Sequence, residues 1–139
     1  MQIEIAITTQ AIELRRELPP ELSGRAGAVA EFVGLVRGEE DGRPIAALEY
    51  EAYSPMAEIV MRRIAEALGR QQPCLWVRVT HRVGVVPVGE AAIHIVVGAR
   101  HRAAAFAMLT GFMNQLKQDV PIWKRRALAT GEWPHCPTP

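Results

Sequence analysis

The sequence predicts a single α+β domain over residues 1–139, with a mixed or antiparallel sheet and two main helices. Three observations support this class. The length suits one domain, and a content of 49% hydrophobic and 22% charged residues is that of an ordinary folded protein. Several short segments alternate apolar and polar residues, as strands do. Two longer segments repeat their apolar residues at helical spacing.

The first part of the chain is expected to hold two strands and a short helix. Isoleucines alternate with polar or small residues in residues 3–7, which predicts a strand with one buried face. Residues 11–18 (AIELRREL) predict a short helix that ends at Pro19. Residues 27–36 (GAVAEFVGLV) are almost continuously apolar, which predicts a strand covered on both faces.

The middle of the chain is expected to form a mobile loop, a strand and the first main helix. Residues 37–44 (RGEEDGRP) combine glycine, proline and acids, as loops do, and residues 45–53 (IAALEYEAY) read as a strand. Ser54 is placed to cap a helix whose first residue is Pro55 and which ends near Gly69. Its expected buried stripe consists of Ile59, Val60, Ile64 and Leu68.

The last part is expected to form two strands, the second main helix and an extended segment. The strands cover residues 75–84 and 91–99 and are joined by a turn. The helix runs from about residue 100 to 118, and Pro121 then starts the extended segment 121–128. Residues 127–139 are expected to be a surface tail. The expected buried stripe of this helix consists of Ala105, Met108, Leu109, Phe112 and Leu116.

Charge and cysteine content argue against several classes of function. The net charge of +1 provides no general attraction for nucleic acid or for an anionic membrane, and an aromatic content of 6% gives little support to an RNA-binding sheet. No apolar run reaches the length of a spanning helix, so we expect a cytoplasmic protein. Cys74 and Cys136 do not form a CxxC pair, so we expect neither a disulfide framework nor a metal site.

Positive charge gathers at the predicted start of the second helix. Arg100, His101 and Arg102 lie where free backbone N–H groups already carry partial positive charge, which is unfavourable for cations. A bound phosphate would compensate, because it accepts hydrogen bonds from both the backbone and the side chains. Orientation of these side chains into solvent is the alternative.

The distribution of lysine is the second unusual feature. Of 16 lysine and arginine residues, only Lys117 and Lys124 are lysines. Lysine can change its charge or act as a nucleophile, whereas arginine cannot readily lose its proton. Strand alternation predicts that Lys124 shares a face with Arg126, while Trp123 and Arg125 lie on the other face. The two lysines therefore indicate a site, although a helix-dipole contact and edge protection are structural alternatives.

The histidines and Trp123 are open to more than one interpretation. His81 and His94 lie inside predicted strands, so we interpret them as core or interface residues with satisfied hydrogen bonds. His135 and Cys136 are too few ligands for a closed metal site. Trp123 either stacks on a ligand or anchors its segment to the core, and alternation favours the second.

Five ordered blocks of sequence resemble the large, catalytic subunit of molybdopterin synthase, the MoaE family. The resemblance covers roughly residues 24–126 and implies an α/β-hammerhead domain without a metal or other cofactor. It also implies a homodimer that binds two copies of a small ubiquitin-like sulfur carrier, a MoaD-like subunit, in a heterotetramer. The blocks are GAVAEFVGLVR, LEYEAYSPMA, HRVGVVPVGE, ARHRAAAF and LKQDVPIWKR.

The resemblance further implies a sulfurtransferase of molybdenum cofactor biosynthesis. The carrier's C-terminal Gly-Gly thiocarboxylate would give two sulfurs to cyclic pyranopterin monophosphate, forming molybdopterin. Lys117 and Lys124 correspond to the catalytic positions. The chain departs from the family at Arg126, where an acidic residue is common, and a non-catalytic module that binds a phosphometabolite or a protein tail is the alternative. The positions implied to contact substrate are Leu35, Val36, Arg37, His101, Arg102, Lys117, Lys124, Arg125 and Arg126.

Overall fold

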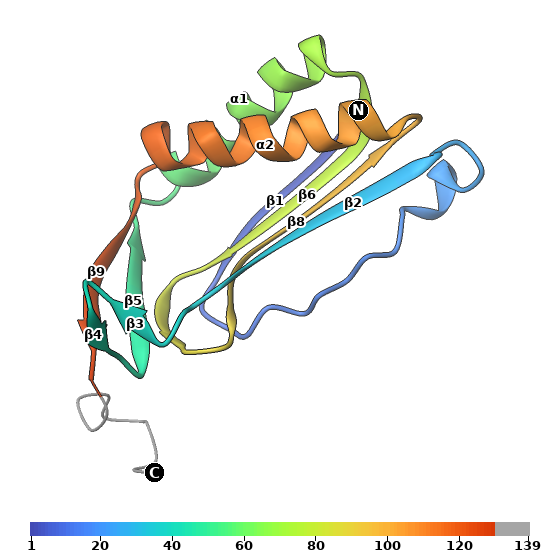
Figure 1. Ribbon diagram of the computed structural model, residues 1–139. Helices are drawn as coiled ribbons and strands as arrows, with labels where there is room; N and C mark the ends of the chain where they lie inside the picture. The colour runs from blue at the N-terminus through green and yellow to red at the C-terminus, as the bar shows by residue number, and fades with distance from the viewer. Residues whose placement is uncertain (130–139) are drawn as a thin grey trace.

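A four-stranded sheet with two helices on one face forms the larger part of the protein (Figure 1). The structure is a computed structural model that describes residues 1–129. β1 pairs with β6 in parallel, and the β6–β8 and β8–β2 pairs are antiparallel, so the predicted mixed sheet is confirmed. In spatial order the strands are β1 (Gln2–Thr8), β6 (Cys74–Arg82), β8 (Ala91–Ala99) and β2 (Ala28–Leu35).

The two predicted helices are both present, as α1 (Met56–Gln71) and α2 (Arg102–Asp119). The stripe predicted for α2 is confirmed, because four of its five residues are buried and Leu109 packs partly buried against them. The stripe predicted for α1 is confirmed in part, because Ile64 and Leu68 are buried and Val60 is partly buried. Ile59 is exposed, and Met61 and Ala65 are buried as well. Ser54 does not cap α1, since its hydroxyl donates a hydrogen bond to the Glu58 carboxylate at 2.6 Å.

The segment predicted as a helix at residues 11–18 has no helical turn. It runs along the face of the sheet opposite the helices (Figure 1), where the Arg15 carbonyl accepts a hydrogen bond from Arg78. Arg16 reaches the Glu31 carboxylate at 2.7 Å. So short a helix is marginal on its own, and these contacts hold the chain extended instead.

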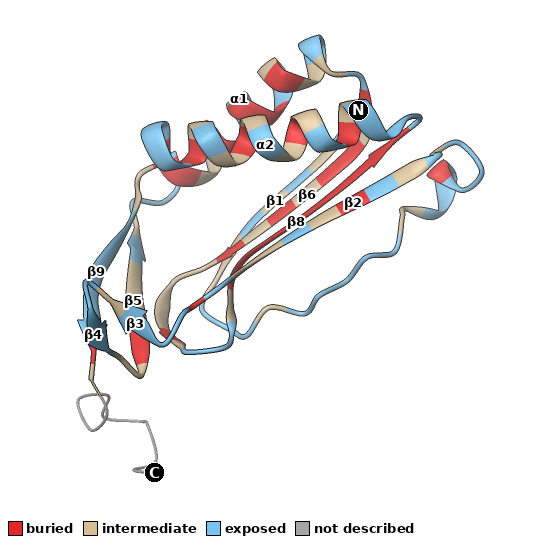
Figure 2. Cartoon of the chain, viewed as in Figure 1, coloured by how far each residue is buried: buried red, intermediate tan, exposed pale blue. Residues whose placement is uncertain are grey.

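The apolar strand β2 is not covered on both faces, so that prediction was wrong. β2 lies at the edge of the sheet, with Val29 48%, Phe32 37% and Leu35 58% exposed. β8, beside it, is the strand that is buried along almost its whole length (Figure 2). β2 therefore leaves an apolar sheet edge open to a partner.

A three-stranded sheet stands at one end of the main sheet (Figure 1). β7 (Gly84–Pro87) follows β6 and precedes β8 in the chain, but it pairs with a strand of this second sheet. Residues 83–90 therefore form more than the predicted turn. The expected loop 37–44 folds back as the small hairpin β3 (Glu39–Glu40) and β4 (Arg43–Pro44). The sheet order is β7, then β5 (Ala47–Ala52), then β9 (Ile122–Leu128).

The C-terminal segment differs in part from the predicted tail. Leu128 is buried at the end of β9, so the tail cannot begin at residue 127. His135 and Cys136 lie outside the described residues. None of the helices within residues 1–129 has the length and apolar character needed to cross a membrane.

Candidate active site

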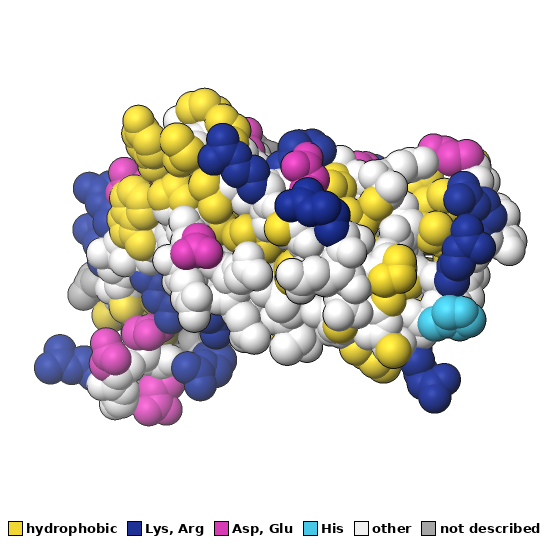
Figure 3. Space-filling model, turned by 90° about the horizontal axis from the view of Figure 1, so that it is seen from above, with side chains coloured by type: hydrophobic (Ala, Val, Ile, Leu, Met, Phe, Trp, Pro, Cys, Tyr) yellow, Lys and Arg dark blue, Asp and Glu magenta, His cyan; other side chains and the backbone are white. Residues whose placement is uncertain are grey.

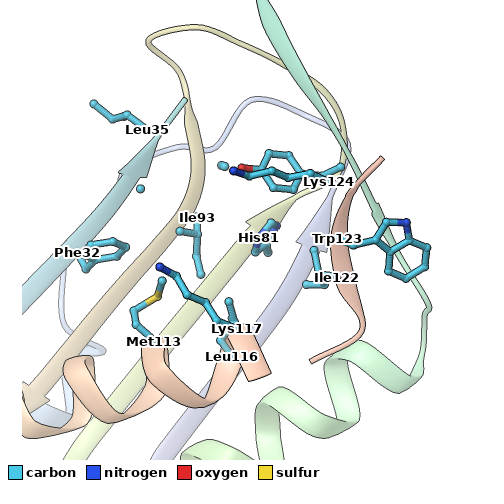
Figure 4. Close-up of a pocket in the computed structure, with 13 residues that line it drawn as sticks. Phe32, Leu35, His81, Ile93, Met113, Leu116, Lys117, Ile122, Trp123 and Lys124 are labelled. Carbon is cyan, nitrogen blue, oxygen red and sulfur yellow. The ribbon is translucent and has the colours of Figure 1, made fainter. Parts of the chain in front are cut away.

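A cavity of about 340 Å³ lies where the two sheets and the C-terminal end of α2 meet (Figure 4). Most of its wall is apolar, and its cationic groups are Lys117 and Lys124. Residues far apart in the sequence thus share one space. The wall consists of Phe32, Gly34, Leu35, Tyr50, His81, Ala92, Ile93, Met113, Leu116, Lys117, Ile122, Trp123 and Lys124.

Lys117 enters the cavity from the last turn of α2. Its helical neighbours Met113 and Leu116 also line the wall, since residues three or four positions apart share a helix face. Within residues 1–129, no acidic side chain forms an ion pair or hydrogen bond with Lys117. An unpaired ammonium group beside apolar side chains is suited to bind an anion from outside the chain.

Lys124 enters the cavity from β9, and Figure 4 shows its amino group and that of Lys117 pointing toward the side formed by Phe32 and Leu35. Unlike Lys117, Lys124 has an internal partner, because its Nζ lies 3.2 Å and 3.3 Å from the two carboxylate oxygens of Glu40. Burial raises the pKa of the Tyr50 phenol in the same wall, and the charge of Glu40 raises it further.

The arginines that follow Lys124 lie outside the cavity. The pairing of β5 with β9 shifts by one residue between Glu49 and Tyr50, so Lys124 pairs with Tyr50 and Arg126 pairs with Glu49. Because of this bulge, the alternation predicted beyond Lys124 is interrupted. Arg126 Nε lies 2.7 Å from Oε1 of Glu49, and Arg125 Nη1 lies 3.9 Å from Oε2 of the same carboxylate.

The three predicted positions at the end of β2 separate in the structure. Leu35 lines the cavity, whereas Val36 is buried in a small cluster with Leu48, Val86 and Ala92. Arg37 is exposed and borders a separate depression formed by the β3–β4 hairpin. Of the three, Leu35 therefore has direct access to the space between the lysines.

The cations at the start of α2 lie at the opposite end of the helix from the cavity. Fifteen residues separate Arg102 from Lys117, which corresponds to about 22 Å along the helix at about 1.5 Å per residue. His101 and Arg102 are exposed, and the first turn contains no acidic residue. Figure 3 shows cationic side chains beside a histidine at one end of the molecule, and a hydrophobic patch with further cationic side chains around it at the other end. A single chain therefore does not bring these cations to the lysines.

Sequence reasoning missed several wall residues, of which Tyr50 and His81 carry polar atoms. Both lie within motifs of the resemblance, LEYEAY and HRVG, and that placement was the available signal. His81 and His94 are buried with a hydrogen bond each, as predicted, but His81 also borders the cavity. Trp123 is 46% exposed and points away from Lys117 (Figure 4), so it does not anchor β9 in the core.

The described residues supply neither a reactive thiol nor a metal site. Cys74 is buried, and burial raises the pKa of its thiol, which disfavours the thiolate. Among residues 1–129 no three histidine, cysteine or acidic side chains gather as metal ligands. The two lysines of the cavity can bind an anion, stabilise negative charge and transfer a proton.

Comparison with known protein families identifies the relatives of this architecture. The family described as MoaE protein matches residues 5–119. The chain belongs to the MoaE family. A structure of the molybdopterin biosynthesis MoaE protein from Burkholderia ambifaria superposes with a TM-score of 0.75 at 31% identity, covering 92% of this chain and 89% of that one. The α/β-hammerhead fold expected from the resemblance is thereby confirmed.

Sequence identity and coverage were compared for individual relatives of the family. The molybdopterin synthase catalytic subunit of Homo sapiens is 42% identical over 104 residues, which are 75% of this chain and 55% of the human protein. This chain therefore spans little more than half of that relative's length. A complex of subunits 1 and 2 of molybdopterin-converting factor from Helicobacter pylori has a TM-score of 0.67 at 21% identity, covering 94% and 91% of the two chains. At that identity it supports the fold alone.

Proposed function

We propose that this chain is the catalytic subunit of a molybdopterin synthase. It would transfer sulfur from the C-terminal thiocarboxylate of a small carrier subunit to cyclic pyranopterin monophosphate, and two transfers would build the dithiolene of molybdopterin. The observation that carries this proposal is the convergence of Lys117 and Lys124, the chain's two lysines, on one largely apolar cavity. The location in the cytoplasm stays a prediction.

The two lysines have different roles in this proposal. Lys117, which has no partner within residues 1–129, neutralises the incoming thiocarboxylate and the charge that develops as sulfur is transferred. Lys124, held by Glu40, binds the substrate phosphate or the carboxylate that is released. The sulfur nucleophile comes from the partner, which agrees with the buried and unreactive Cys74.

We further propose that a second copy of the chain completes the site with its His101 and Arg102. β2 runs between the two regions, because Ala28 pairs with Ala99, next to the cations, and Leu35 lines the cavity. The eight residues of β2 span about 26 Å at about 3.3 Å per residue, close to the 22 Å that separates the cations from Lys117.

Antiparallel pairing of β2 with β2 of a second copy would therefore place the cations of one chain beside the cavity of the other. The open edge and the exposed Val29 and Phe32 supply an apolar surface for such a contact. The phosphate group of the substrate would then bind to His101 and Arg102 of one copy, while the pterin ring of the same substrate molecule faces Lys117 of the other copy. Arg37 borders the separate depression beside the hairpin, so its predicted contact with substrate stays a prediction.

Reconstitution tests the proposed function. The purified chain is mixed with thiocarboxylated carrier and the pyranopterin precursor, and dithiolene product is assayed. We expect product to depend on all three components. Binding of precursor and carrier by the folded protein without sulfur transfer would contradict the proposal and favour the non-catalytic binding module.

A further inference from the structure

His81 is a buried histidine of the cavity wall that the roles given to the lysines leave unused. It lies next to the end of β6, is 5% exposed and borders the same cavity as Lys117 (Figure 4). Its ring meets the Tyr50 ring edge-on, with centroids 5.5 Å apart at an interplanar angle of 71°. This packing fixes the plane of the imidazole.

The hydrogen bond of His81 determines which nitrogen carries the proton. Nδ1 lies 2.8 Å from the carbonyl oxygen of Arg82. Since a carbonyl can only accept, Nδ1 must donate, and the lone pair of the neutral ring is then on Nε2. Within residues 1–129 no protein group forms a hydrogen bond with Nε2. Among the side-chain atoms of these residues, Arg82 Nε is the one that is fully enclosed and has no hydrogen-bond partner, so the unpaired Nε2 is not fully enclosed. Nε2 is therefore accessible from the cavity.

The surroundings of His81 keep its ring neutral. Burial lowers the pKa of the imidazole below its ordinary value of 6.5, and the hydrogen bond to Arg82 opposes this only in part. The titratable groups that share the cavity are Tyr50 on β5, Lys117 on α2 and Lys124 on β9.

We propose that Nε2 of His81 is a proton acceptor for the substrate bound in the cavity, and thus a catalytic group besides the two lysines. This rests on the proposed function. An O–H or N–H group of the pterin gives its proton to Nε2, and the bonding electron pair stays on the substrate atom. The imidazolium then releases that proton to water at the open side of the cavity. Nothing is oxidised or reduced, and the neutral ring is restored.

The activity test uses His81→Gln, because glutamine can form hydrogen bonds but cannot titrate. We expect kcat/KM to fall by about 10²-fold or more, as for loss of a general base. The acid limb of the pH profile, below pH 6.5 in the native protein, should also disappear. His94→Gln is the matched control, since His94 is equally buried but its Nε2 is bound by Glu31 at 2.6 Å. It should keep the acid limb.

An NMR titration of the native protein tests the inference without relying on the folding of a variant. The His81 imidazole should titrate below 6.5, and its Nε2 resonance should shift when the pyranopterin precursor binds, while that of His94 should not. An unchanged Nε2 resonance in the precursor complex, or a His81→Gln protein with the native pH profile, would overturn the proposal. If Nε2 responds to precursor but the native complex makes no dithiolene, the proposed function fails and with it the catalytic role of His81, and contact between His81 and the bound precursor is what remains.

Discussion

Replacement of Lys117 by alanine should reduce turnover strongly and leave the fold intact. The ammonium group has no acidic partner within residues 1–129, so its removal leaves no carboxylate there without its counterion. At about 4 Å from an anion and an effective dielectric constant of about 20, a unit charge contributes about 4 kcal/mol. Loss of one preorganised donor typically costs about 10²- to 10³-fold in kcat, and this is the range we expect.

The assay for Lys117→Ala is single-turnover dithiolene formation with saturating carrier and precursor. Stability should fall by about 1 kcal/mol or less, because a cation in the last turn of a helix interacts favourably with the helix dipole. Arg70→Ala is the matched control, since Arg70 occupies the last turn of α1 and is remote from the cavity. Near-native turnover by folded Lys117→Ala protein would refute the role of this lysine.

Two further substitutions test the charge network. Glu40→Gln removes the internal partner of Lys124, so the ammonium group no longer exchanges an ion pair for the anionic substrate. KM should fall by up to about five-fold, because exposed ion pairs contribute about 1 kcal/mol or less. A higher KM in steady-state kinetics would contradict this. For Glu31, the hydrogen bond from Arg16 lowers the carboxyl pKa below its ordinary value of 4.5, with a smaller contribution from His94. The resulting stability is present above pH 4.5 and is lost as pH falls through the folded pKa. Glu31→Gln should therefore destabilise the protein at pH 7 and do so less and less as pH falls below 4.5, as urea unfolding at a series of pH values would reveal.

The regular elements were predictable because local pattern and burial agree in them. The stripe of α2 follows from its spacing, since α2 packs that face on the sheet. The strand around Lys124 follows from Pro121, which cannot continue the helix. In α1 the pattern was ambiguous, because Ile59 and Met61 are both apolar and the packing selects Met61.

The parts that were mispredicted depend on contacts between distant segments. The composition of β2 is that of a central strand, and only the sheet order places β2 at an edge. The helix expected at residues 11–18 is replaced by contacts of Arg15 and Arg16 with the sheet. Local periodicity identifies neither the strand beside β2 nor the part of the sheet that residues 11–18 contact.

The candidate site was predictable in its cations and not in its geometry. Residue type alone singled out Lys117 and Lys124, and both border the cavity. The distance from His101 to that cavity is set by the length of α2, so it becomes evident only once the fold is known. His81 went unrecognised because a histidine inside an alternating strand carries no local sign of a cavity beside it.

A mixed dimer gives the most direct test of the claim that two copies gather their cations around each cavity. Lys117→Ala chains and His101→Ala/Arg102→Ala chains carry different tags and are co-expressed, and dimers that hold both tags are purified. One of the two sites then has all its cations, so the mixed dimer should retain about half of the native activity, while each parent dimer is nearly inactive. A mixed dimer as inactive as its parents would contradict the account.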